Sequence, residues 1–179
     1  MTRFHPTLLC CAALFGLADA FAPSGRNLAA PAEMEFLDRF VGSWEVRAIG
    51  QDDSTPPHGR MSAHYILDGT MLQADYRGLG PQGEVGFRGT SLRTWDPVAR
   101  LFTMKWAMSF DKGYTIIEAH VEDGDLVSTG KGEDRAGAFV ERYRFFDFSE
   151  DAFKFEMERS YDGEQSWQRM AYNQYTRSE

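Results

Sequence analysis

Short runs in which apolar and polar side chains alternate recur along most of this chain, and this pattern constrains the fold more than any other. The clearest run is 101–108, where Phe102, Met104, Trp106 and Met108 share one face. A period of two is the period of a β-strand with one buried face. Asp-Gly pairs at 68–69, 123–124 and 162–163 separate successive runs, and such pairs favour tight hairpins. The pattern therefore predicts an antiparallel all-β protein.

About ten strands are predicted, preceded by one short helix over 34–40. An open sheet of so many strands would leave long exposed edges, and closure into a barrel removes them. We therefore expect an up-and-down barrel, with a two-sheet sandwich as the competing architecture. The first predicted strand contains Trp44, Val46 and Ala48, and the others cover 60–67, 70–77, 84–95, 101–108, 114–122, 126–131, 138–148, 152–161 and 167–176.

The first twenty residues have the pattern of a cleaved export signal. Arg3 is followed by a mostly apolar run over 8–17 and by Ala18-Asp19-Ala20, a small-residue cleavage site. The run is too short for a permanent membrane span. We expect a signal peptide over 1–20, a flexible segment over 21–32 and one domain over 33–179, in a periplasmic or secreted protein. Both cysteines lie in the signal, so the mature chain would contain no thiol.

Charge and motifs exclude several classes of function. The formal net charge is −8 and no basic stripe is present, so nucleic acid is not an expected partner. No phosphate-binding loop, dinucleotide fingerprint, metalloprotease motif or serine-nucleophile turn occurs. The sequence therefore predicts no metal site and no cofactor, and it leaves the oligomeric state open.

A Gly-x-Trp motif, Gly42-x-Trp44, opens the first strand after the predicted helix. In this arrangement the chain resembles the calycin group, which includes lipocalins and fatty-acid-binding proteins. More closely, it resembles an uncharacterised, mainly bacterial family, domain-of-unknown-function family 1579, over about 33–177. The motifs that carry this resemblance are Leu37-Asp38-x-Phe40-Val41-Gly42-x-Trp44, Tyr65-Ile66-Leu67-Asp68-Gly69, Gly86-x-x-Gly89, Trp95-Asp96 and the closing run over 167–175.

The resemblance has one departure and one competitor. Where that family often has Gly-Tyr-Asp, this chain has Thr94-Trp95-Asp96. Haem-binding nitrobindins also open near a Gly-x-Trp, but their first strand is richer in glycine than Glu45-Val46-Arg47. What the resemblance implies is a barrel with a ligand-sized cavity, and a fold alone does not settle function.

The alternating faces suggest which residues enclose such a cavity. Methionine and aromatic side chains adapt to varied apolar ligands, although the same face also suits an ordinary core. Trp44 is interpreted as structural, because a large buried aromatic residue usually serves packing. The resemblance to lipocalin-like barrels implies that it packs at the closed end against a basic residue of the last strand, Arg169 or Arg177. The predicted cavity is lined by Leu72, Phe102, Met104, Trp106, Phe153, Phe155 and Met157, with Tyr65, Tyr172 and Arg159 as polar contacts.

Two strands leave their orientation open. The smaller apolar face of 114–122 favours an outward His120, whereas the opposite orientation would make His120 a possible haem or metal ligand. On 138–148, either Glu141 or Arg142 must point inward, and a buried charge needs a partner. Arg159 would either pair with Glu141 or hold a ligand carboxylate.

The leading functional hypothesis is an exported protein that binds a small apolar or amphipathic molecule. One alternative is an enzyme without a cofactor, such as an isomerase or lyase, that uses Glu141, Tyr143 or His120 as acid or base. Others are a haem-binding barrel and an interaction module with a filled core.

Overall fold

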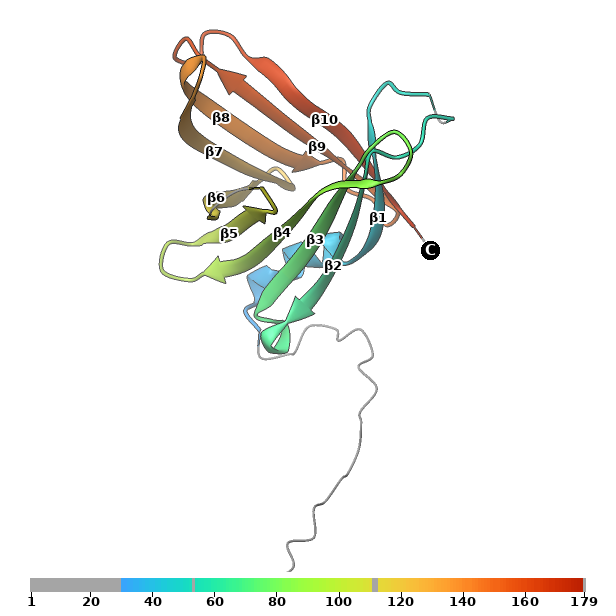
Figure 1. The fold of residues 1–179 in the computed structure, drawn as a ribbon. Coiled ribbons are helices and arrows are strands. Elements are labelled where there is room, and N and C mark those ends of the chain that lie inside the picture. The colour runs from blue at the N-terminus through green and yellow to red at the C-terminus, as the bar shows by residue number, and fades with distance from the viewer. Residues whose placement is uncertain (1–29, 53, 111–112, 179) are drawn as a thin grey trace, which may run out of the picture.

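Ten antiparallel strands close into a barrel in the computed structural model, which describes residues 30–52, 54–110 and 113–178 (Figure 1). Each strand pairs with its neighbour in sequence, and β1 closes the barrel against β10, with Val46 opposite Tyr175. The barrel prediction is confirmed and the sandwich is excluded. The strands are β1 (Gly42–Ala48), β2 (Gly59–Ile66), β3 (Met71–Leu79), β4 (Val85–Asp96), β5 (Leu101–Met108), β6 (Thr115–Glu122), β7 (Asp125–Asp134), β8 (Gly137–Phe146), β9 (Ala152–Ser160) and β10 (Gln168–Arg177).

A 3₁₀-helix, η1 (Ala32–Phe40), lies at one end of the barrel (Figure 1). Its buried residues are Met34, Leu37 and Phe40. A 3₁₀-helix has three residues per turn, so side chains spaced by three lie on one side and face the barrel together. The predicted short helix is therefore present, and its apolar side packs against the interior at this end.

Tyr65 of β2 fixes η1 in this position. Its side chain is only 4% exposed, and its hydroxyl lies 2.8 Å from the carbonyl oxygen of Met34 and 2.6 Å from Oδ1 of Asp38. Both acceptors belong to η1. This strand and the helix are therefore joined by polar contacts as well as by apolar packing.

Trp44 lies directly behind η1 and is fully buried. Its Nε1 donates a hydrogen bond to the carbonyl oxygen of Phe40 at 2.8 Å. The guanidinium carbon of Arg177 lies 4.4 Å from the centroid of the indole ring. Of the two arginines considered as partners, Arg177 makes this contact. Arg169 instead pairs with Glu156 on the outer face.

The turns follow the glycine signals in part. Asp123 and Gly124 have φ values of 51° and 88°, the pair of positive angles that a two-residue type I′ hairpin requires. At the β2–β3 connection Leu67 also has a positive φ of 49°. That connection is the short 3₁₀ turn η2 (Leu67–Gly69) and not the two-residue turn predicted there.

Candidate functional site

The barrel interior has a packed end and a more accessible end. Near η1 the inner face is sealed, and Leu72, Phe102 and Phe153 are at most 1% exposed. Phe153 alone has ring centroids of Trp44, Phe40 and Tyr175 within 5.2 Å. These contacts form a dense floor at this end of the barrel.

Beyond the floor, inward side chains are only partly buried. Trp106 of β5 and Phe155 and Met157 of β9 all fall in this half-buried group. Gly89 lies under the Trp106 ring, and a Cβ there would lie 2.3 Å from the indole. On β7, a Cβ at Gly130 would meet no atom within 4 Å. The inner wall is therefore less tightly enclosed at this end than at the end near η1.

The predicted cavity residues thus separate into two groups that differ in burial. Leu72, Phe102, Met104 and Phe153 belong to the packed floor, whereas Trp106, Phe155, Met157 and Arg159 face the accessible part.

The structure places the two predicted tyrosines away from the cavity. The Tyr65 hydroxyl is engaged with η1. Tyr172 lies on the outer face, where its ring stacks on that of Phe146 at 6.4 Å, and the prediction that it points inward is wrong. Pairing of Tyr175 with Phe153 and Val46 directs the odd-numbered residues of β10 from Ala171 to Tyr175 inward, so Tyr172 must face outward.

A buried ion pair occupies the accessible end of β8 and β9. Glu141 is 7% exposed, and its carboxylate accepts hydrogen bonds from Nε of Arg159 and from the hydroxyl of Tyr143. Arg159 also reaches Oδ2 of Asp134 at 3.1 Å. Of the two orientations left open on β8, Glu141 is inward, and Arg142 is outward in an ion pair with Glu158.

Arg93 of β4 is a second inward arginine, to which no motif in the sequence points. It is 5% exposed, and its Nε donates to Oγ of Ser91 at 3.0 Å. Its guanidinium carbon lies 4.5 Å from the ring centroid of Phe40 and 5.2 Å from that of Phe145. Burial lowers the pKa of Arg93 to about 10, so the group remains charged near neutral pH.

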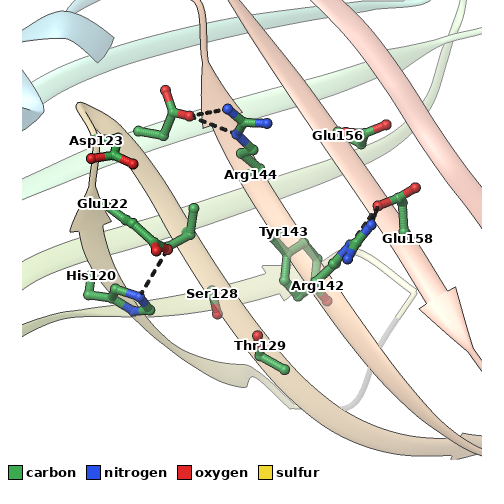
Figure 2. A pocket seen from close by; sticks show the side chains of 12 residues that line it. His120, Glu122, Asp123, Ser128, Thr129, Arg142, Tyr143, Arg144, Glu156 and Glu158 are labelled. Atoms are coloured by element: carbon green, nitrogen blue, oxygen red, sulfur yellow. Dashed lines mark hydrogen bonds and ion pairs between the residues drawn. The ribbon is translucent and has the colours of Figure 1, made fainter. Parts of the chain in front are cut away.

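His120 lies on the outer face, as the apolar pattern predicted, with 61% of its side chain exposed, while Ala119 beside it is 1% exposed. It borders a surface hollow of about 420 Å³ over β6 to β9 (Figure 2). There Arg144 pairs with Asp125 and Arg142 pairs with Glu158, each with a closest contact of 2.5 Å. Glu122, Asp123 and Glu156 also line the hollow, so carboxylates outnumber arginines and its lining is acidic overall. A second hollow of about 400 Å³ lies over β3 and β4.

The enzyme hypothesis uses Glu141, Tyr143 or His120 as acid or base, and the haem hypothesis uses His120 as a ligand. The structure separates these residues. Glu141 and Tyr143 converge inside the barrel, whereas His120 is on the opposite face of the wall. Among residues 30–52, 54–110 and 113–178, no group of three or more His, Cys, Asp or Glu side chains is arranged to hold a metal ion.

Three tyrosines are expected to make the protein unstable at alkaline pH: Tyr175 is buried, and Tyr76 and Tyr143 are half-buried. Burial raises the pKa of Tyr76 to about 12 and also raises those of Tyr143 and Tyr175. Unfolded tyrosines ionise near pH 10, so the stability that depends on neutral phenols is complete below that pH and is lost above it. Arg93, whose pKa is lowered, opposes this loss, but three groups outweigh one. We expect the melting temperature to fall steeply between about pH 10 and 12.

Circular dichroism melts across this range, with phenolate absorbance recorded in parallel, measure the effect. In the folded protein the late phenolate signal should rise together with unfolding, whereas in denaturant all tyrosines should titrate near pH 10. A melting temperature that stays constant up to pH 12 would contradict the burial of these hydroxyls.

The fold and its interior define the class of protein: a ten-stranded lipocalin-like barrel with an N-terminal helix against one end. The family model described as "Protein of unknown function (DUF1579)" matches residues 30–177. The chain belongs to this family. No curated protein matches the chain. Within the described residues, no helix has both the length and the apolar character needed to cross a bilayer.

Proposed function

We propose that this protein is an exported carrier for a small apolar or amphipathic molecule, which binds inside the barrel. The observation that carries the proposal is the contrast between the packed floor and the half-buried Trp106, Phe155 and Met157 above it. A side chain that only completes a core is normally sealed by its neighbours. Aromatic and methionine side chains left accessible on a concave wall are typical of ligand sites.

In this proposal the ligand enters through the wall between β6 and β7. Strands β6 and β7 pair over four positions, from Glu122 opposite Asp125 to Ala119 opposite Ser128. Beyond that point β7 continues along β8 as far as Asp134, while β6 continues along β5. The ladder between β6 and β7 therefore ends part-way along the wall, and a ligand would enter beside Gly130 without disrupting strand pairs.

Export is part of the proposal and depends on the sequence pattern of residues 1–20, which lie outside the described residues. Native mass spectrometry of the protein purified from its own envelope tests both parts together. Cleavage after Ala20 gives a chain that begins at Phe21. A co-purifying compound, seen as added mass that is lost on denaturation, supports binding and identifies its chemical class. A chain that retains residues 1–20 would contradict export.

Replacing Trp106 with Ala should weaken the binding of an apolar probe without preventing folding. The indole lines the accessible interior and packs over Gly89, so its loss removes apolar contact from the ligand. We expect the affinity for the neutral dye Nile red, followed by fluorescence titration, to fall about tenfold. Trp167→Ala is the matched control, because Trp167 packs under the guanidinium of the outward-facing Arg142. Equal affinity in wild type and Trp106→Ala would remove Trp106 from the site.

A further inference from the structure

Arg93 is a buried cation whose hydrogen-bonding capacity is largely unused. Nε bonds to Ser91, but Nη1 is enclosed and has no hydrogen-bond partner among the described residues. No carboxylate within those residues forms an ion pair with it. The rings of Phe40 and Phe145 attract the positive charge, yet they supply no oxygen acceptor. Buried polar groups are normally satisfied, so this one requires an explanation.

The other inward arginine, Arg159, has its charge and its hydrogen-bond donors matched by carboxylates of the protein. Arg159 bonds to Glu141 and Asp134, so its charge is compensated within the protein. Arg93 has no carboxylate partner among the described residues, so its positive charge on the inner wall is not compensated by them. Ser128, on the inner face of β7, also has a buried hydroxyl oxygen without a hydrogen-bond partner. The barrel interior therefore has unused polar capacity beside its apolar surface.

Strand register places Arg93 deeper in the barrel than the proposed apolar site. Ser91, which bonds to Arg93, is directly opposite Trp106, and Arg93 is opposite Met104. Phe40, the last residue of η1, lies against the guanidinium. A ligand that enters from the accessible end would thus pass Trp106 first and reach Arg93 at the floor.

We propose that Arg93 anchors an anionic head group, so that the ligand is an amphiphilic acid whose apolar body lies along Trp106, Phe155 and Met157. This inference rests on the proposed binding function and specifies its ligand class. A carboxylate offers two acceptor oxygens in the geometry of the guanidinium fork. It would supply both the missing hydrogen bond and the missing countercharge. Because the pKa of Arg93 is about 10, the attraction persists across the neutral range.

Two probes of similar shape separate charge from apolar contact: 2-naphthoate and the neutral 2-naphthylmethanol, each titrated into the protein by calorimetry. The flat ring system suits an aromatic wall. Wild type should bind the acid at least tenfold more tightly. Arg93→Met should lower affinity for the acid by about 10- to 100-fold, which corresponds to about 1.4–2.7 kcal/mol, and leave the alcohol within about threefold. Arg93→Lys keeps the charge without the fork and should be intermediate.

Two further variants make the result specific. Arg142→Met removes an outward arginine from β8 and should leave both affinities unchanged. Arg159→Met tests the other inward arginine. If it, and not Arg93→Met, abolishes the preference for the acid, the assignment to Arg93 is wrong. In wild type the preference should also disappear below about pH 4, where the acid becomes protonated.

The two proposals fail in different ways. Equal affinities for acid and alcohol in wild type would overturn the anion site while leaving the carrier function intact. Absence of binding by either probe, together with no Nile red binding, would overturn both. Circular dichroism of each variant shows whether a lost affinity reflects a lost fold.

Discussion

Replacing Trp44 with Ala is expected to destabilise the protein by about 3–5 kcal/mol. The indole is fully buried, and removing it leaves a cavity between η1 and the floor. Its loss also leaves the carbonyl oxygen of Phe40 without a donor and removes the aromatic surface under Arg177. The ring of Phe153, 4.8 Å away in an edge-to-face arrangement, would lose one of its aromatic neighbours. Urea unfolding followed by circular dichroism measures the change.

Trp167→Ala is again the matched control, because the same atoms are removed from a half-buried site before β10. There we expect a loss below about 1 kcal/mol. Equal losses for the two variants would show that Trp44 does not hold η1 against the barrel. We expect Trp44→Ala to affect ligand binding only through stability, because the indole lies within the packed floor.

Strand order and closure could be read from the sequence because they depend on local signals that repeat. Alternation fixes which residues share a face, and hairpin turns fix antiparallel order. The 3₁₀ form of η1 was harder to predict from the sequence. Its buried residues Met34, Leu37 and Phe40 are spaced by three, but Phe36 also fits an α-helical stripe. Only the packing against the barrel selects between these two patterns.

Orientation on mixed strands could not be derived from one strand alone. Glu141 points inward because its cross-strand partner Arg159 does, and that pairing depends on the register of two strands. Tyr172 was misplaced for a similar reason. An irregularity between Arg169 and Ala171 shifts the register near the start of β10, so parity cannot be counted from the strand's beginning.

Arg93 was missed because the middle of the inner face of β4 gives no apolar signal. Gly89, Ser91 and Arg93 point inward, while Leu92 points outward, so the strand has the reverse of the usual pattern. One clue was available: Gly89 and Trp95 share the face of Arg93 and belong to the motifs that resemble the family. Sequences reveal functional sites poorly where those sites break the rules that stabilise the fold.

Because Arg93 is a buried charge without an ionic partner, Arg93→Met is expected to stabilise the ligand-free protein by about 1–4 kcal/mol. Methionine fills a similar volume with apolar atoms, and it removes a cation that the interior does not neutralise. The lost contacts with Phe40 and Phe145 oppose this gain, at up to about 2 kcal/mol for a desolvated cation–π pair. The desolvation of an unpaired charge costs several kcal/mol and should exceed them. Thermal unfolding without ligand should show a melting temperature higher by about 2–4 °C per kcal/mol.

Arg142→Met is the control for this measurement, because it removes an outward arginine from its ion pair with Glu158 and should lower stability by at most about 1 kcal/mol. A lower melting temperature for Arg93→Met would mean that Arg93 is a structural cation that the two rings sufficiently compensate. A higher melting temperature together with weaker binding of 2-naphthoate would have another meaning. It would show that the chain retains an unfavourable charge because the ligand requires it, since residues kept at a cost to stability are characteristic of functional sites.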